Sequence, residues 1–532
     1  MKKLEPVDVL IIGSGAAGSA VARSLADSKL RVVCLEQGVK VREEEFPANQ
    51  VNWQSKNVRK FSHLPTVRGD SWFTPIDDLG SPIKIANYYG VGGSTILFSG
   101  HYPRFHEFDF KTLSNEGLGA DWPITYSDLE IFYEQNRKYT PVAGLEGDPA
   151  YPPIKNLLPP VPIGAMGEVL ADGFNKLGWH WWPSYSAIAT RKLGHHNECL
   201  NVGTCNLGCP QRAKSSSDIS YWIDALKLGV ELREGCKAEE VITGQGAKLH
   251  EVIYTTRAND KFIQPSSVVV LACGGIATPG LMLRSIKKNP SGLSNSSNLV
   301  GKNLMLHPLV YVEGIYDKDL NSDYGPQGCC IASHEFAGGK SFDYKHRGFT
   351  MQVVRGPSPV TSALRWHKRK RLKPGTNFFS EFKTLHNRTS HITVITEDLP
   401  ENTNRVTIHR NSANRIDVKY KVEYKLSDGS KKALSAGTKK AKEILQASGA
   451  KEIMAFAPVA DSGWHIMGTV RMGQNRQDSV VDAFGESHDD PGIFVADSSV
   501  FVTSSSVNPT ATIHALALRC AQRIKEKYGI SK

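Results

Sequence analysis

A glycine-rich turn near the start of the chain constrains the fold more than any other feature. Residues 7–12 are apolar and rich in β-branched types, which predicts a buried strand, and residues 19–28 have the apolar spacing of a helix. The segment Gly13-Ser14-Gly15-Ala16-Ala17-Gly18 lies between them. In this context the first glycine permits a tight turn, the second lets the backbone approach a pyrophosphate, and the third lets the helix pack closely on the strand. The turn therefore predicts a dinucleotide site at a helix N-terminus.

An acidic residue follows the next expected strand. Residues 30–35 are apolar, and Glu36 comes directly after them. A carboxylate at this place accepts hydrogen bonds from ribose hydroxyls, and an acid rather than an arginine disfavours NADP. The pattern fits both FAD and NAD. The residues that we expect to contact the dinucleotide here are Gly13, Ser14, Gly15, Ala17, Gly18 and Glu36.

Composition bounds the class of protein. Of the 532 residues, 40% are apolar and 22% are charged, which is typical of a folded globular chain and excludes global disorder. No apolar run is long enough for a membrane-spanning helix, and nine cysteines are too few for a disulfide scaffold. Glu5 and Asp8 interrupt the apolar start of the chain, so we expect no signal peptide, no membrane partner and a cytoplasmic location.

The net charge of +11 is modest for a chain of this length. Its densest part is residues 367–373, which read His-Lys-Arg-Lys-Arg-Leu-Lys and precede Pro374-Gly375. No nucleic-acid recognition motif accompanies this basic run. We therefore expect an exposed loop and no nucleic-acid partner.

The middle of the chain has a different pattern from its ends. Short alternating stretches predict an antiparallel sheet with strands at residues 349–354, 391–395, 404–408 and 416–420. Helical spacing occurs at 431–447 and 513–528. We predict an α/β fold in which a Rossmann-like dinucleotide domain is interleaved with a β-sheet substrate domain. The first would comprise residues 1–110, 195–310 and 456–532, and the second residues 111–194 and 311–455.

Three blocks near the end of the chain carry a family resemblance. They are His465-Ile466-Met467-Gly468-Thr469-Val470-Arg471-Met472-Gly473, Ala496-Asp497-Ser498-Ser499 and Asn508-Pro509-Thr510. In sequence, order and spacing they resemble the glucose–methanol–choline (GMC) oxidoreductases, flavoproteins that oxidise alcohols. The resemblance implies the GMC fold, FAD as the cofactor and a small-molecule alcohol as the substrate.

The resemblance also assigns cofactor contacts outside the first glycine turn. Residues 90–95 resemble the flavin loop of the family, and Asp497 resembles the residue that holds the ribityl or phosphate region. Some sugar-oxidising relatives attach the flavin to a histidine where this chain has Ile96, so we expect non-covalent FAD. The further contacts implied are Gly93, Ser94, Thr95, Ala238, Asp497, Pro509 and Thr510.

His465 and Asn508 are the expected catalytic residues. Alcohol oxidation needs a base for the hydroxyl proton, and histidine titrates near neutrality. The resemblance makes the flavin N5 the hydride acceptor. Asn508 would hydrogen-bond the same substrate oxygen, and the helix that starts after it would stabilise negative charge on the flavin.

The substrate and the electron acceptor are less constrained by the sequence. The segment from Cys205 to Trp222 resembles one in bacterial sugar and glycoside oxidases of the family, which implies a carbohydrate substrate and oxygen or another acceptor. A dehydrogenase that uses a quinone or cytochrome, a sterol oxidase, a hydroxynitrile lyase and a non-catalytic flavin protein remain alternatives. Cys199, Cys205 and Cys209 have no fourth soft ligand close by, so we expect no metal.

Overall fold

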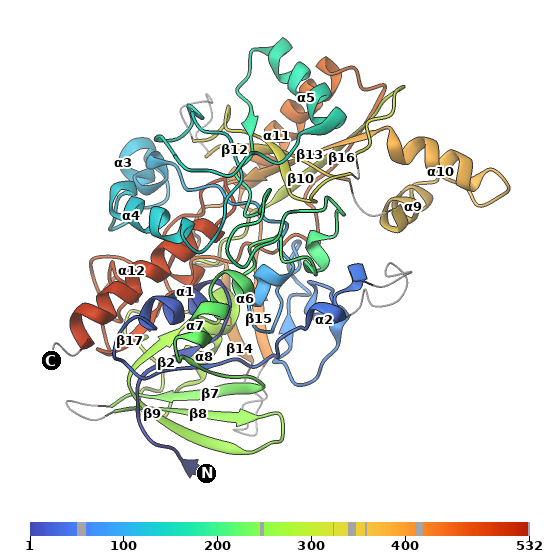
Figure 1. Ribbon diagram of the computed structural model, residues 1–532. Helices are drawn as coiled ribbons and strands as arrows, with labels where there is room; N and C mark the ends of the chain where they lie inside the picture. Colours follow the sequence, from blue (N-terminus) through green and yellow to red (C-terminus); the bar gives the residue numbers. More distant parts are fainter. Residues whose placement is uncertain are drawn as a thin grey trace.

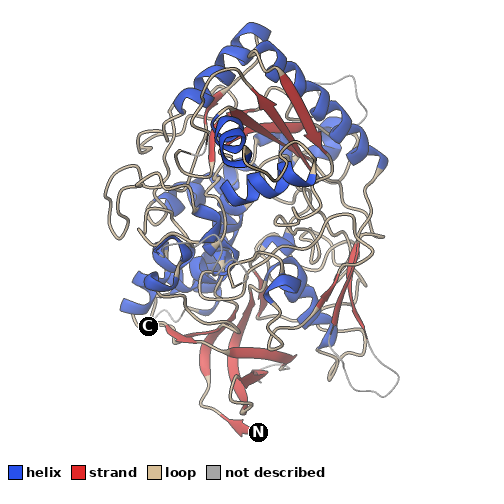
Figure 2. Cartoon of the chain, turned by 90° about the vertical axis from the view of Figure 1, so that its right-hand side faces the viewer, coloured by secondary structure: helices blue, strands red, loops and turns tan. Residues whose placement is uncertain are grey.

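The computed structural model describes residues 1–49, 60–244, 249–322, 324–338, 347–356, 359–409 and 419–529. Two main sheets lie at opposite ends of the molecule, with helices packed around them (Figures 1 and 2). Both termini lie toward the end that holds the larger sheet (Figure 2). Both ends of the chain therefore lie in the same half of the molecule.

The larger sheet has eight strands in the order β6-β3-β2-β9-β8-β7, with β1 and β17 also paired to β9. Strands β2, β3, β6, β9 and β17 pair in parallel, whereas β7 and β8 are antiparallel additions. All four residues of β3 are buried, which explains why its sequence is a continuous apolar run. The bounds are β1 (Lys2–Lys3), β2 (Val7–Ile12), β3 (Val32–Leu35), β6 (Glu231–Arg233), β7 (Cys236–Ile242), β8 (His250–Thr256), β9 (Lys261–Leu271) and β17 (Ile493–Val495).

Helices from both ends of the chain pack beside this sheet. α1 (Ala16–Leu25) follows the glycine turn directly and packs against the C-terminal helix α12 (Thr510–Tyr528), which also contacts α4 (Tyr126–Arg137). The two helices predicted for these ends are thus confirmed, although α1 is shifted toward the turn. Further helices are α2 (Pro65–Arg68), α3 (Thr112–Glu116), α6 (Ser217–Ser220), α7 (Trp222–Lys227) and α8 (Gly274–Arg284).

The second sheet has six antiparallel strands in the order β16-β10-β13-β12-β11-β5. The predicted helix at 431–447 is α11 (Asp428–Ala447), which packs on β10 and β13 and against α5 (Gly164–Leu177). Its apolar face covers one side of the sheet, so the other side is free to line a cavity. The strands are β5 (Trp182–Pro183), β10 (Leu309–Ile315), β11 (Cys329–Ser333), β12 (Phe349–Val354), β13 (Thr389–Thr396) and β16 (Glu452–Phe456).

Two predicted strands of the middle region lie outside that sheet. β14 (Arg405–His409) and β15 (Lys419–Glu423) pair with β4 (Ile76–Asp77) in a separate three-stranded sheet. The prediction that they extend the substrate sheet is wrong, because their apolar residues pack against Ile276 of α8 and neighbouring residues. The start of the second predicted strand, residues 416–418, lies outside the described residues.

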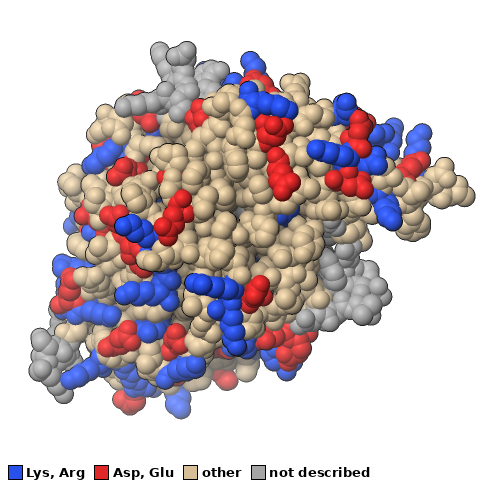
Figure 3. Space-filling model, turned by 45° about the horizontal axis from the view of Figure 1, so that its top comes forward, with Lys and Arg blue, Asp and Glu red and all other residues tan. Residues whose placement is uncertain are grey.

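The basic run is only partly a loop. Its first two residues end α9 (Pro359–Lys368), which lies with α10 (Phe378–Asn387) in a helical projection beside the second sheet (Figure 1). Lys and Arg side chains are interspersed with Asp and Glu over the face drawn in Figure 3. In the part of the chain described, no helix combines the length and apolar character needed to span a bilayer.

Candidate active site

A cavity of about 860 Å³ is lined by residues from both sheets. This volume is in the range typical of ligand and cofactor sites. It gathers every predicted site residue except Gly18, although these residues are scattered from the first glycine turn to the last helix. The predicted residues that line it are Gly13, Ser14, Gly15, Ala17, Glu36, Gly93, Ser94, Thr95, Ala238, His465, Asp497, Asn508, Pro509 and Thr510.

Gly18 does not line the cavity; it lets α1 pack against the glycine turn. A Cβ on Gly18 would lie 1.9 Å from the carbonyl oxygen of Gly13, so only glycine lets α1 approach the turn this closely. Gly13 itself has a φ of +100°, in the region that favours glycine. A Cβ on Gly93 would lie 2.8 Å from the Cα of Gly15, so the two glycine-rich loops meet backbone to backbone.

Two helix N-termini open on the cavity without a side-chain cap. The residue before α1 is Gly15 and the residue before α12 is Pro509, and neither offers a capping side chain. The first turns of both helices also lack acidic residues. Unsatisfied N–H groups and the positive end of a helix dipole attract anions. A glycine cradle and two such helix ends in one elongated cavity fit a dinucleotide cofactor such as FAD.

The Glu36 carboxylate lies at the edge of this cavity, where ribose recognition was predicted. It accepts hydrogen bonds from the Ser14 N–H at 3.0 Å, the Ser14 hydroxyl at 2.7 Å and the Gly38 N–H at 2.7 Å. Burial raises its pKa, and these hydrogen bonds oppose the shift. Glu36 therefore also holds the glycine turn in place, a role that the sequence did not suggest.

Asp497 and Ala238 line the cavity but already have protein partners. The Asp497 carboxylate accepts from the Gly274 N–H at 2.8 Å and from the hydroxyls of Thr278 and Ser499, both at 2.6 Å. It therefore joins the start of α8 to the segment after β17. The Ala238 carbonyl accepts a hydrogen bond from Arg284. Contact of either residue with FAD stays a prediction.

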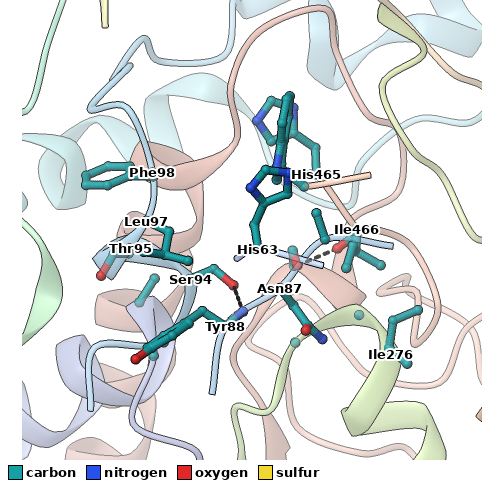
Figure 4. A pocket seen from close by; sticks show the side chains of 18 of the residues that line it. His63, Asn87, Tyr88, Ser94, Thr95, Leu97, Phe98, Ile276, His465 and Ile466 are labelled. Atoms are coloured by element: carbon teal, nitrogen blue, oxygen red, sulfur yellow. Dashed lines mark hydrogen bonds between the residues drawn. The ribbon is translucent and has the colours of Figure 1, made fainter. Parts of the chain in front are cut away.

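The loop before α3 brings several more side chains to the cavity. Figure 4 shows Ser94 and Thr95 on this loop, with His63 and His465 at the same pocket, and the Ser94 hydroxyl accepts from the Tyr88 N–H at 3.1 Å. Ile96 is buried in a separate apolar cluster. His101, which the sequence places farther along the loop, does line the cavity, and burial lowers its pKa to about 4.

A chain of hydrogen bonds crosses the cavity at His465. The Gln352 amide N–H donates to Asn508 Oδ1 at 2.6 Å, and Asn508 Nδ2 lies 3.4 Å from His465 Nε2. His465 Nδ1 lies 2.8 Å from His307 Nδ1, and His307 Nε2 lies 3.2 Å from the carbonyl oxygen of Ser504. The two predicted catalytic residues are thus neighbours, and two further residues hold them.

This series of hydrogen bonds determines which ring nitrogens of His307 and His465 carry protons. A carbonyl oxygen only accepts, so His307 Nε2 must carry a proton toward Ser504. Burial lowers the pKa of His307 to about 4, so the ring is neutral at pH 7 and its Nδ1 is an acceptor. His465 must then donate from Nδ1. Burial and the neighbouring His307 hold the pKa of His465 well below its usual range, which leaves Nε2 unprotonated.

His307 and Gln352 contact the candidate catalytic residues, and the sequence analysis assigned no role to either. His307 follows the segment Gly301-Lys302-Asn303-Leu304, which resembles a family block but indicates no role. Gln352 stands in a stretch whose alternation predicts a strand but assigns no role to its polar positions. Its position beside Asn508 depends on contact between residues 156 positions apart, which no local pattern reveals.

The cysteine block is joined to the glycine loop through a buried lysine. Within the described residues, no three His, Cys, Asp or Glu side chains form a group that could hold a metal ion. The Lys214 ammonium instead donates to the carbonyls of Ile96 and Phe98, both at 2.8 Å, and of Cys205 at 2.6 Å. Burial lowers the pKa of Lys214 to about 8. This ammonium fixes the end of the glycine loop to the block that contains Cys205.

The glycine cradle, the two open helix ends and the neutral His465 fit a redox flavoprotein of the dinucleotide-binding class. Sequence profiles described as GMC oxidoreductase match residues 160–309 and 400–517, and a profile described as FAD binding domain matches residues 8–47. The 2-methyl-1,2-propanediol dehydrogenase of Mycolicibacterium austroafricanum is 33% identical, covering 99% of this chain and 96% of that protein. The chain belongs to the GMC oxidoreductase family.

Other similar proteins agree with this assignment. The fructose dehydrogenase large subunit of Gluconobacter japonicus is 25% identical and covers 97% of both chains. Pyridoxine 4-oxidase from Mesorbium loti has a TM-score of 0.64 at 15% identity, covering 98% of this chain and 99% of that structure, which shows the shared fold. The chain is therefore an FAD-dependent enzyme that oxidises alcohol CH–OH groups, and the predicted family and fold are confirmed.

Proposed function

We propose that His465 Nε2 takes the hydroxyl proton of the alcohol while Asn508 Nδ2 donates to the same oxygen. The observation that carries this proposal is the hydrogen-bond chain from Gln352 to Ser504, which leaves one unprotonated ring nitrogen beside the Asn508 amide. A base that is neutral at pH 7 and held in a fixed orientation is ready to accept a proton.

The cofactor complements these residues. When bound, FAD supplies the acceptor for the hydride that leaves the carbinol carbon. Gly13, Gly15 and the N-terminus of α1 would hold its pyrophosphate, and the N-terminus of α12 would lie near negative charge at the flavin. His465 would then hold the proton at Nε2. Any further transfer through His465 Nδ1 would end at His307, because His307 Nε2 already donates to the Ser504 carbonyl.

The substrate class is open between two candidates. The relatives include a dehydrogenase named for a small diol and another named for fructose. Leu309, Val354 and Ile395 form an apolar part of the cavity wall, and this part offers no hydrogen bonds to the hydroxyls of a sugar. We therefore favour a non-carbohydrate alcohol, with the sugar or glycoside expected from the sequence as the second candidate.

Anaerobic absorbance of the purified enzyme tests this function. We expect aliphatic alcohols or diols to bleach the oxidised-flavin band and sugars to leave it unchanged. Bleaching by sugars alone would establish the second candidate. Absence of bleaching by every alcohol would contradict the proposed reaction. Re-oxidation on admission of air would identify an oxidase, and re-oxidation only by a quinone or cytochrome would identify a dehydrogenase.

We also propose that FAD is bound without a covalent link. Ile96 has no nucleophilic group and is packed away from the cavity. Acid precipitation should then release all of the flavin into the supernatant and leave a colourless pellet. A yellow pellet would contradict this proposal. Loss of that colour in His101→Ala would then identify His101, one of the histidines that line the cavity, as the attachment point.

A further inference from the structure

One row of side chains crosses the second sheet from the catalytic residues to the far end of the cavity. The strand register pairs Gln352 with Thr393, Thr393 with Tyr311, and Tyr311 with Phe456. All four residues line the cavity. Because adjacent strands are about 4.8 Å apart, Tyr311 lies roughly 10 Å across the sheet from Gln352. The cavity therefore extends well beyond the reacting centre.

Two arginines, one in α9 and one directly after it, meet the far end of this row. The guanidinium carbon of Arg365 lies 4.7 Å from the centre of the Tyr311 ring, and that of Arg369 lies 3.5 Å from the centre of the Phe456 ring. Both arginines and Lys368 line the cavity. The row therefore begins at Gln352, which donates to Asn508, and ends at the two arginines.

Polar atoms at this end lack hydrogen-bond partners. Among the described residues, the Tyr311 hydroxyl and one terminal nitrogen of Arg369 are buried with no hydrogen-bond partner, and the corresponding nitrogen of Arg365 has only the Glu313 carboxylate, 3.6 Å away. Buried donors are normally satisfied, so these groups show that the arginines are under-paired, and both arginines also line the cavity, where a ligand can reach them. A guanidinium presents a planar pair of donors that matches a carboxylate or a phosphate.

Acidic residues neutralise this cationic end only in part. Glu313 accepts from the Trp366 indole at 2.9 Å and lies 3.6 Å from Arg365 and 3.5 Å from His391. Asp461 also lines the cavity, and it interacts with His63. Arg365, Arg369 and Lys368 therefore outnumber these two carboxylates. Burial and the neighbouring Arg365 lower the pKa of Arg369, as expected for incompletely paired cations.

We propose that the substrate is an elongated alcohol whose end remote from the hydroxyl carries a carboxylate or a phosphate, bound by Arg365, Arg369 and the Tyr311 hydroxyl. This inference rests on the proposed function and specifies its substrate. The carbinol carbon gives up a hydride to FAD and its hydroxyl gives up a proton to His465. The product is the aldehyde that still carries the anion. The methylene chain between the two ends would lie along Thr393, Leu309 and Ile395.

The test compares anionic and neutral alcohols of equal length. The probes are octanoate hydroxylated on its terminal carbon, the corresponding hydroxyoctyl phosphate, and n-octanol. We expect a higher kcat/KM for an anionic probe than for n-octanol in anaerobic flavin reduction, and the better of the two anions distinguishes carboxylate from phosphate. Octanoate without a hydroxyl should inhibit competitively, and its inhibition should weaken as the salt concentration rises.

Arg369→Gln assigns the effect to the cationic end. We expect the ratio of kcat/KM for anion over n-octanol to fall by about tenfold to a hundredfold, because a charge-assisted hydrogen bond is lost. Lys373→Gln removes one exposed charge from the same basic run and should leave the ratio unchanged. Arg365→Met provides a second variant if the first does not fold.

The outcomes separate this inference from the proposed function. If n-octanol bleaches the flavin and the anions gain nothing over it, the function stands and the anion site is wrong. Equal losses for both probes in Arg369→Gln would show a structural role and overturn the proposal. Slower re-oxidation with unchanged flavin reduction would show that the arginines serve an electron acceptor, which also overturns it.

Discussion

The two walls of the cavity are built in different ways. On the cofactor side, function depends on backbone geometry set by short segments, such as the turn from Gly13 to Gly18 and the start of α12. On the substrate side, function depends on side chains that meet only through the register of four strands. The cofactor wall therefore requires residues that permit a particular backbone conformation. The substrate wall requires particular side chains to lie opposite one another on adjacent strands.

The strongest test of this contrast changes the cofactor wall at one glycine. In Gly18→Val a side chain would occupy the space 1.9 Å from the Gly13 carbonyl oxygen, so α1 cannot approach the turn. We expect purified Gly18→Val to contain no FAD by absorbance. Gly80→Ala is the control, because a Cβ there meets nothing within 4 Å and the flavin content should be normal. Full flavin in Gly18→Val would show that the turn does not hold the cofactor.

A smaller effect is expected on the substrate wall. Gln352→Leu removes the donor to Asn508 Oδ1 and frees the Asn508 amide to rotate away from His465. We expect anaerobic flavin reduction to slow by about tenfold to a hundredfold, with normal FAD content. The control is Met351→Leu, a buried substitution of similar volume at the next position of β12. An unchanged rate in Gln352→Leu would show that the hydrogen bond from Gln352 to Asn508 does not contribute to catalysis.

The contrast between the walls explains what the sequence could predict. The Rossmann-like turn, the ends of the chain and the pair His465 and Asn508 were predictable because each depends on a compact motif with family-like spacing. The roles of His307 and Gln352 were not, because a hydrogen-bond partner across the fold leaves no local pattern. The misplacement of β14 and β15 has the same cause, since alternation predicts a strand but not its neighbours.

A loss of stability in acid is also expected. Burial lowers the pKa of His101 and His307 from the ordinary 6.5 to about 4, and that of His514 to about 3. Below pH 6.5 these histidines are protonated in the unfolded chain but remain neutral in the folded chain. The stability they contribute is therefore fully present above pH 6.5 and falls as the pH decreases toward 4. Urea unfolding measured across this interval should show the decline, and His514→Gln should make it shallower. A flat profile would contradict neutral burial of these histidines.

The most direct test of the central claim is the rate of anaerobic flavin reduction in His465→Gln with the best alcohol of the panel. The geometry places the unprotonated Nε2 of His465 beside Asn508, so its loss removes the base while the glycine cradle is untouched. We predict normal FAD content and a rate about a hundredfold to ten-thousandfold lower than that of the unmodified enzyme. A rate within a few fold of the unmodified enzyme would show that another group takes the proton.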